Sequence, residues 1–307
     1  MRTMSTRNVR LAVAPPFDLR LCLHGHGWVA LAPHVFDEAT GTLRTVLLLG
    51  DLAVDATLAQ TAPDALRLQL AAARPLTAQH GSNAAAQIAH MLRLRDDLST
   101  FHARCAAEPR LAWAARRGAG RLMRSATVFE DLMKLLFTTN TSWSGTEAMT
   151  RNLVAAAGTP APSGNRAFPT PAQCRRTPDF FRDVVRAGYR ADAALRLANA
   201  FVSGELTDAT FLGPQSSEQL WQRLLDLHGF GPYAAGQAMR LCGHYDRLAL
   251  DSWCRARLAE MAGRSKAPAD RTVERRYAKW APFQGLALWL DLTADWHGEG
   301  VAAEASP

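Results

Sequence analysis

The first quarter of the chain alternates apolar and polar residues in the way that strands of a half-buried sheet do. Alternating or continuous apolar segments cover residues 18–23, 27–31, 42–49, 53–58 and 66–70. Turn-forming residues separate several of these segments, notably at 24–27 and 37–41. The pattern predicts an antiparallel sheet of four or five strands, and we assign residues 1–82 to a β-rich N-terminal domain.

Beyond Gly81 the apolar positions follow the longer period of amphipathic helices. The pattern predicts helices at 83–106, 129–137, 146–157, 178–187, 192–203, 217–227, 233–241, 251–261 and 272–296. Ser216 and Gln219 are spaced as a capping box at one helix start, and Gly243 suits the end of another. We therefore expect a mainly helical domain over 83–297, followed by a disordered tail at 298–307.

Composition adds a basic balance to this picture. The 307 residues include 35 Lys and Arg against 28 Asp and Glu, a formal charge of +7. A basic protein favours a polyanionic partner, and arginine suits bidentate contacts to phosphate. The same excess of arginine also follows from a GC-rich genome, so charge alone leaves the partner open.

The cysteines and the apolar segments exclude several classes of protein. The five cysteines show neither C-x-x-C spacing nor a four-cysteine iron–sulfur pattern, and no cluster of His and Cys is spaced for zinc. The first ten residues lack the apolar core of a secretory signal, and no segment is long enough to span a bilayer. We expect a cytoplasmic protein without a metal or a membrane partner.

The segment between two of the predicted helices contains Gly229 and Gly231, followed by Pro232. Glycines allow positive φ and close approach of a backbone, and proline suits the first turn of a helix. This predicts a helix-hairpin-helix at about 217–243 whose second helix directs free amides at an anion such as a nucleic-acid phosphate. The alternative is a tight turn between helices that binds nothing.

Asp251 lies 18 residues after Tyr233, at the predicted start of the next helix. Aspartate is a preferred N-cap, and capping is the whole role of most such residues. A carboxylate beside a phosphate clamp also faces the adjacent sugar, where it can stabilise the positive charge that develops as an N-glycosidic bond breaks. The spacing therefore makes Asp251 a candidate catalytic acid.

The hairpin segment 227–235 together with Asp251 resembles the helix-hairpin-helix DNA glycosylase superfamily. Upstream segments at 129–143, 168–171 and 188–191 resemble further parts of the 8-oxoguanine and 3-methyladenine glycosylases, in the same order, so the resemblance covers about 85–297. It implies an α+β fold, with an N-terminal antiparallel sheet domain and a helical body in two subdomains.

The resemblance also implies roles for individual residues near the hairpin. Asp251 would be the catalytic acid. Gly229 and Gly231 would clamp a phosphate, and we place Trp253 with them as a phosphate-binding residue. The resemblance also implies a monovalent cation held by hairpin carbonyls, and it implies no other cofactor.

A second group of residues would act on the opened duplex. Asn140 falls where the family fills the gap left by the extruded nucleotide, and Tyr189 and Arg190 fall where it contacts the orphaned base. The target nucleotide must leave the stack because its glycosidic bond is inaccessible within a duplex. The alternatives are a core position for Tyr189, a solvated charge for Arg190 and a helix cap for Asn140.

Tyr233 decides the expected reaction type. Members of the family that also cleave the strand carry a lysine at this position, which forms a Schiff base with the sugar, whereas a tyrosine cannot. An aromatic ring there resembles the alkylation-repair members, in which rings stack on cationic bases. We therefore assign Tyr233 to the base pocket and add Trp289, for which a core position is the alternative.

These observations predict a monofunctional DNA glycosylase of base excision repair. It would hydrolyse the N-glycosidic bond of a flipped-out damaged purine, with an alkylated purine such as 3-methyladenine as the first candidate. The alternatives are an 8-oxoguanine glycosylase without lyase activity and an inactive, structure-specific DNA-binding protein. The expected partner is double-stranded DNA containing a damaged base, bound by a monomer.

Overall fold

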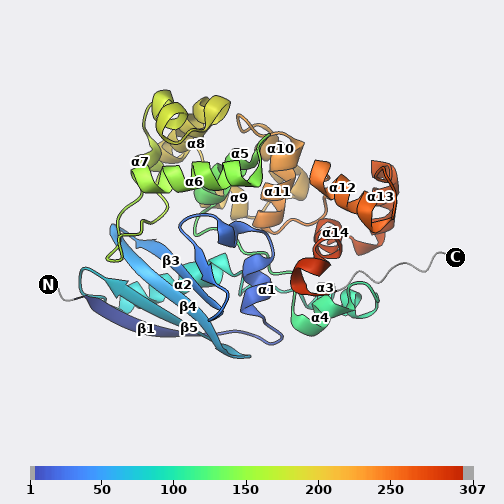
Figure 1. The fold of residues 1–307 in the computed structure, drawn as a ribbon, viewed down its shortest axis with the longest axis horizontal. Coiled ribbons are helices and arrows are strands. Elements are labelled where there is room, and N and C mark those ends of the chain that lie inside the picture. Colours follow the sequence, from blue (N-terminus) through green and yellow to red (C-terminus); the bar gives the residue numbers. More distant parts are fainter. Residues whose placement is uncertain (1–3, 300–307) are drawn as a thin grey trace. The chain divides into compact units, whose positions relative to one another are not determined.

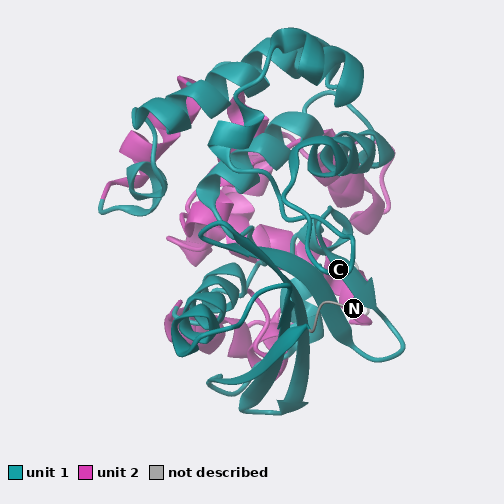
Figure 2. Cartoon of the chain, turned by 90° about the vertical axis from the view of Figure 1, so that its left-hand side faces the viewer, with its two compact units in different colours: residues 1–95, 121–214, 227–229 teal, residues 96–120, 215–226, 230–307 magenta. Residues whose placement is uncertain are grey.

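The chain folds into two compact units, each built from separate stretches of sequence. A computed structural model describes residues 4–299. The first unit comprises 1–95, 121–214 and 227–229, and the second comprises 96–120, 215–226 and 230–307 (Figure 2). Part of the predicted tail, 300–307, lies outside the described residues.

The first unit contains one five-stranded antiparallel sheet with the strand order β1-β5-β4-β3-β2. The strands are β1 (Ser5–Ala12), β2 (Val35–Asp37), β3 (Thr42–Leu49), β4 (Leu52–Ala62) and β5 (Ala65–Ala72). Helix α2 (Ala78–Met91) covers one face, where Ala84, Ile88 and Met91 join the leucines of the strands in one core (Figure 1). The predicted antiparallel sheet is confirmed, whereas the predicted boundary at 82/83 falls inside α2.

Two of the predicted strands are wrong. Residues 18–23 mostly form the helix α1 (Leu19–His24), and 27–31 contain the 3-10 turn η1 (Trp28–Ala30). The carboxylate of Asp18 accepts a hydrogen bond from the Leu21 amide at 3.1 Å and starts α1, an N-cap signal that outweighs a short apolar segment.

Strand β1 was not predicted, because its sequence is mostly polar. Its residues alternate between exposed and partly covered, with Val9 and Leu11 packed on the core side. The strand is defined by its pairing with β5, in which Ser5 lies opposite Ala72 and Ala12 opposite Ala65. Main-chain pairing with a distant strand leaves little trace in a single sequence.

The remaining helices of the first unit surround α5. They are α5 (Val128–Thr138), α6 (Trp143–Ala157), α7 (Pro171–Cys174), α8 (Ala191–Ser203) and α9 (Asp208–Leu212), with a π turn η2 (Phe180–Val184) and a 3-10 turn η3 (Gly188–Arg190). The helix predicted at 178–187 is thus only a π turn, which ends before Arg186 at a φ of 63°. The short helices α7 and α9 were missed because neither is long enough to show a period.

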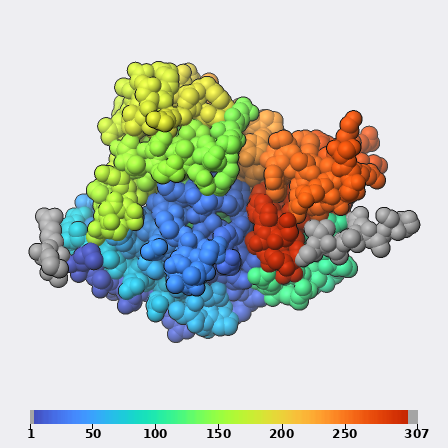
Figure 3. Space-filling view, in the orientation of Figure 1, coloured from blue at the N-terminus to red at the C-terminus, as the bar shows by residue number. Residues whose placement is uncertain are grey.

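The loop that follows α6 lies on the face of the sheet opposite α2. Ala161 and Ala167 pack with Val46 and Ala53 of the strands. Ser163 donates hydrogen bonds to Asp55 from its amide, at 2.9 Å, and from its hydroxyl, at 2.5 Å. Figure 3 shows the yellow-green atoms of this loop against the blue atoms of the sheet. The polar contacts and the small apolar cluster together fix the loop.

The second unit is helical. It contains α3 (Ser99–Ala106), α4 (Ala112–Arg117), α10 (Ser217–Leu225), α11 (Pro232–Cys242), α12 (Ser252–Met261), α13 (Asp270–Tyr277) and α14 (Gln284–Leu292), with 3-10 turns η4 (Ala278–Trp280) and η5 (Ala294–His297). The predicted capping box of Ser216 with Gln219 and the left-handed C-cap at Gly243 are both confirmed.

Two long predicted helices are each divided in the structure. The segment 83–106 is divided between α2 and α3, with Arg93 in the left-handed region between them at a φ of 56°. The segment 272–296 stops at Pro282, which has no amide hydrogen for an α-helical bond, and continues as α14 and η5. Apolar periodicity persists across such breaks and hides them.

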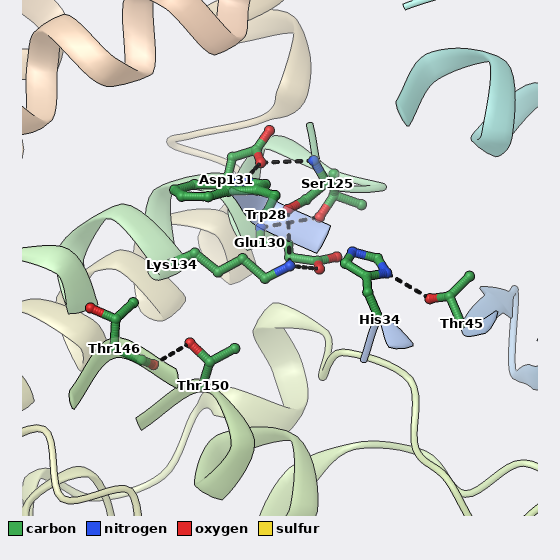
Figure 4. A network of polar contacts seen from close by, with 10 residues as sticks. Trp28, His34, Thr45, Ser125, Glu130, Asp131, Lys134, Thr146 and Thr150 are labelled. Carbon is green, nitrogen blue, oxygen red and sulfur yellow. Dashed lines mark hydrogen bonds and ion pairs between the residues drawn. The ribbon is translucent and has the colours of Figure 1, made fainter. Parts of the chain in front are cut away.

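Helix α5 carries a buried network of charged side chains (Figure 4). The fully buried Lys134 donates to Glu130 at 2.6 Å and to the Ser125 hydroxyl at 3.3 Å. Asp131 accepts from the Trp28 indole at 2.7 Å and from the Ser125 amide at 2.8 Å. Burial raises the pKa of both carboxyl groups. The network ties η1 to α5 and therefore links the sheet region to the helices of the same unit.

His34 borders this network and is buried in its neutral form. Its Nδ1 lies 2.9 Å from the Thr45 hydroxyl, and its Nε2 has no hydrogen-bond partner among the residues that the structure describes. Burial, with a smaller contribution from the charge of Lys134, lowers the pKa of His34 well below its ordinary value of 6.5. Protonation of His34 is therefore favoured in the unfolded chain.

The stability of the first unit should accordingly fall as the pH falls below 6.5. Above that pH the imidazole is neutral in both states and contributes no pH dependence, whereas below it only the unfolded chain takes up the proton. When the pH is lowered from 6.5 to 5.5, the free energy of unfolding should decrease in both proteins. The decrease should be about 1 kcal/mol smaller in His34→Gln than in the wild type. Urea titrations at the two pH values measure this, and equal losses in both proteins would contradict it.

Candidate active site and DNA interface

The hairpin between α10 and α11 has the predicted geometry. Gly231 is the N-cap of α11, and Pro232 occupies its first turn. Gly229 has a φ of 86°, and a Cβ at this position would lie 2.8 Å from Leu136 and 2.9 Å from Ala193. Gly229 is therefore required both by its backbone conformation and by its neighbours.

Gly231 has a different reason to be glycine. Its φ of −118° suits any residue, and a Cβ there would meet no atom within 4 Å. The missing side chain leaves open space in front of the first amides of α11, where the helix dipole favours an anion. Gly229 therefore allows the hairpin to pack closely against Leu136 and Ala193, whereas Gly231 leaves the start of α11 accessible to a ligand.

Asp251 is the N-cap of α12. One carboxylate oxygen accepts a hydrogen bond from the Cys254 amide at 2.6 Å, which holds the side chain in one orientation. The side chain is still partly exposed. Capping and access to a ligand are thus compatible at this residue.

The loop before Asp251 is pressed tightly onto two helices. Ala249 has a φ of 51°, which is unfavourable for any residue with a Cβ. A Cβ on Gly236 of α11 would lie 2.5 Å from the Cβ of Ala249, and one on Gly285 of α14 would lie 2.1 Å from the carbonyl oxygen of Arg247. Only glycines at these two helix positions allow the loop to approach so closely.

The most unusual side chain beside this loop is Arg240, which is 1 % exposed. Its guanidinium donates to Gln237 at 2.9 Å and to the Leu248 carbonyl at 3.3 Å. It also lies 4.6 Å from the ring centre of Trp289. Burial lowers the pKa of Arg240, and the acidic groups that oppose this shift include the Asp251 carboxylate. The Asp251 carboxylate therefore helps to keep this buried guanidinium charged.

Arg240 was missed by sequence reasoning, although a signal for it exists. Tyr233, Gln237 and Arg240 are separated by four and three residues and so share one face of α11. Arginine on a helix is ordinarily solvated, whereas this one is buried and contacts Trp289 of α14 and the Leu248 carbonyl of the loop before Asp251.

Three tryptophans form one cluster in the second unit. The ring centres of Trp253 and Trp289 are 5.6 Å apart, those of Trp253 and Trp296 5.4 Å, and those of Trp289 and Trp296 5.9 Å. Trp289 is 7 % exposed, whereas Trp253 and Trp296 are 38 % and 49 % exposed. The two exposed rings are available to a ligand, and Trp296 was not predicted.

The three residues expected at the opened duplex come together in the first unit. Asn140, at a φ of 44°, donates to the Tyr189 hydroxyl at 3.2 Å. Arg190 is 6 % exposed, donates to the Thr139 hydroxyl at 3.1 Å, and lies 4.5 Å from the Tyr189 ring centre. Tyr189 is 66 % exposed. The arrangement presents the tyrosine ring outward over a fixed guanidinium.

The predicted site residues thus fall into two groups, one in each compact unit. Asn140, Tyr189, Arg190 and Gly229 belong to the first, and the second contains Gly231, Tyr233, Asp251, Trp253 and Trp289. Within residues 4–299, no three His, Cys, Asp or Glu side chains are grouped as metal ligands would be. No helix in that range has the length and apolar character needed to cross a bilayer.

Solved structures of DNA glycosylases share this fold over nearly the whole chain. The 3-methyladenine DNA glycosylase of Archaeoglobus fulgidus matches with a TM-score of 0.73 and 14% identity, covering 94% of this chain and 98% of its own. The 8-oxoguanine glycosylase/lyase of Clostridium acetobutylicum, bound to double-stranded DNA with cytosine opposite 8-oxoguanine, matches with a TM-score of 0.70 and 17% identity, covering 96% and 98%.

A third structure, of MBOgg1 with a low-affinity DNA ligand, matches with a TM-score of 0.72 and 17% identity over 96% of this chain and 99% of its own. No family model and no curated protein matches the sequence. The chain therefore shares the α+β fold of these three structures, with an N-terminal antiparallel sheet followed by a mainly helical body.

Proposed function

We propose that the protein is a monofunctional DNA glycosylase that removes a damaged purine from double-stranded DNA. The observation that carries this proposal is Asp251, a partly exposed carboxylate held rigidly at the start of α12, 18 residues after the hairpin tyrosine. As the glycosidic bond breaks, positive charge develops on the sugar, and a preorganised carboxylate stabilises it without reorganising. Asp251 also orients the water that attacks the sugar.

Hydrolysis without strand cleavage follows from the lysine positions. Tyr233 cannot form a Schiff base, and the three lysines, Lys134, Lys266 and Lys279, all lie outside the hairpin. Lys134 is fully buried in its pair with Glu130, and Lys279 pairs with Glu108. The product is then an abasic site in an intact strand.

The hairpin holds the DNA backbone in this proposal. The amides at the start of α11 bind one phosphate beside the lesion, with Gly229 and Gly231 allowing its approach. The carbonyl oxygens of Leu227 and Gly229 accept no hydrogen bond from the described residues, so their chemistry fits the monovalent cation that the resemblance implies. Such a cation would add positive charge beside the phosphate. Trp253, at the start of α12, would contact the backbone next to it.

The lesion we propose is an alkylated purine. Such a base is electron-poor, and the rings of Tyr233 and Trp296, both at least partly exposed in the second unit, suit stacking on it. The buried Trp289, whose ring centre lies 5.9 Å from that of Trp296, would pack against the buried side of this base pocket. The second candidate is 8-oxoguanine, which is favoured by Arg240, because a fixed buried cation repels a positively charged base and tolerates a neutral one.

A panel of duplexes decides between the lesions. Each carries one 3-methyladenine, 7-methylguanine or 8-oxoguanine, and abasic sites are cleaved with alkali after incubation. We expect faster single-turnover excision of the two methylated bases than of 8-oxoguanine. The opposite order would replace the alkylated purine with the second candidate, and duplex binding without any excision would favour the inactive DNA-binding protein.

The exposed Tyr189 is proposed to wedge into the stack when the damaged base leaves it, with Arg190 holding the ring and Asn140 entering the gap. Tyr189→Ala should lower single-turnover excision from a paired duplex about tenfold, the value of one stacking contact. The loss should shrink when the lesion is mispaired, because that base is already partly unstacked. Tyr189→Phe is the matched control and should keep most of the rate. An equal loss in both duplexes would argue against the wedge.

A further inference from the structure

The buried guanidinium of Arg240 is a charge that the proposed reaction does not use directly. Fully buried arginines are rare, because taking a charge out of water is costly unless it is well paired. Here the positive charge has neutral hydrogen-bond acceptors in Gln237 and in the Leu248 carbonyl, and a π face in Trp289. The negative charge of Asp251 favours the charged form of Arg240.

One hydrogen bond of Arg240 is made to the loop that precedes Asp251, the proposed catalytic acid. The Leu248 carbonyl lies three residues before Asp251, and Ala249 between them is held at a positive φ. A strained loop relaxes unless its surroundings oppose it. Gly236 provides the space for this loop on α11, and Arg240 provides a hydrogen bond to it from the same helix one turn later.

We propose that Arg240 is a positioning residue, which locks the loop 247–250 against α11 and thereby fixes the orientation of the Asp251 carboxylate. This inference rests on the proposed function. In it, Arg240 acts on the reaction through Asp251 and does not itself contact DNA. Misplacing a reacting group by about 1 Å costs about a hundredfold in rate, so a partial loosening of the loop has a large effect.

The first readout is independent of catalysis. Hydrogen exchange of the segment 247–254 reports the local stability of the loop and of the hydrogen bond that the Cys254 amide donates to Asp251. We expect Arg240→Met, which keeps the length of the side chain and loses its charge and donors, to speed exchange in this segment selectively. Arg110→Met is the matched control, because Arg110 is also a partly buried arginine of the second unit and its charge is paired with Asp291 of α14 at 3.0 Å. It should leave exchange in 247–254 unchanged.

The second readout is the excision rate at a temperature well below either variant's Tm. Arg240→Met should lower the single-turnover rate about tenfold or more while changing the Kd for a duplex with a tetrahydrofuran abasic-site analogue by less than about threefold. Arg240→Lys, which restores the charge, should recover part of the rate. Unchanged exchange in Arg240→Met, or the same acceleration in Arg110→Met, would overturn the proposal. Wild-type protein that excises no base, with the exchange pattern as expected, would instead overturn the proposed function alone.

Discussion

Asp251→Asn should lower the single-turnover rate of base excision roughly 100- to 1,000-fold while leaving the fold and DNA binding intact. Asparagine caps a helix as well as aspartate does, so the hydrogen bond from the Cys254 amide persists and the start of α12 is preserved. What disappears is the negative charge beside the sugar. Excision rates and the Kd for an abasic-site duplex, measured on the same preparations, separate the two contributions.

A second capping aspartate supplies the control for this substitution. Asp18 caps α1 in the first unit by the same kind of contact, to the Leu21 amide. Asp18→Asn should leave the excision rate unchanged. Equal activity in Asp251→Asn and wild type would show that another group is the catalytic acid.

Gly236→Ala should disable the protein almost as completely, although Gly236 is buried within α11. The new methyl group would lie 2.5 Å from the Cβ of Ala249 and 3.1 Å from its Cα, so the loop before Asp251 must move. We expect about 1–3 kcal/mol of lost stability from overpacking and about a hundredfold loss in excision rate from the displaced carboxylate. Thermal unfolding and single-turnover excision measure the two effects.

The double variant Gly236→Ala with Ala249→Gly tests this explanation. Removing the methyl group of residue 249 relieves the shortest contact, and glycine accepts the φ of 51° without strain. The double variant should therefore recover a substantial part of both stability and rate. If it is as inactive as Gly236→Ala, the loss arises from something other than the contact with Ala249.

The parts of the site that could be predicted from sequence are those specified by local chemistry. Gly231 before Pro232, Gly243 at a helix end and Asp251 at a helix start each act on their own turn of the chain, so their residue types alone predicted the hairpin and its caps. The grouping of Asn140 with Tyr189 was expected only from the resemblance, since 49 residues separate them.

The parts that could not be predicted depend on contacts between distant segments. Arg240 is buried in contact with Trp289 of α14 and with the loop 247–250, and the face that it shares with Tyr233 and Gln237 on α11 does not by itself reveal this burial. Strand β1 is defined by its partner β5, and α1 was mistaken for a strand because six residues are too few to distinguish the two periods.

In the proposed reaction, Asp251 directs hydrolysis of the glycosidic bond and the protein itself leaves the DNA strand intact. The most direct measurement follows a duplex containing 3-methyladenine, quantifying free base by chromatography and strand breaks by electrophoresis with and without alkali, in the presence and absence of borohydride. We expect stoichiometric free base, strand breaks only after alkali, and no covalent complex trapped by borohydride. Breaks without alkali together with a trapped complex would contradict it.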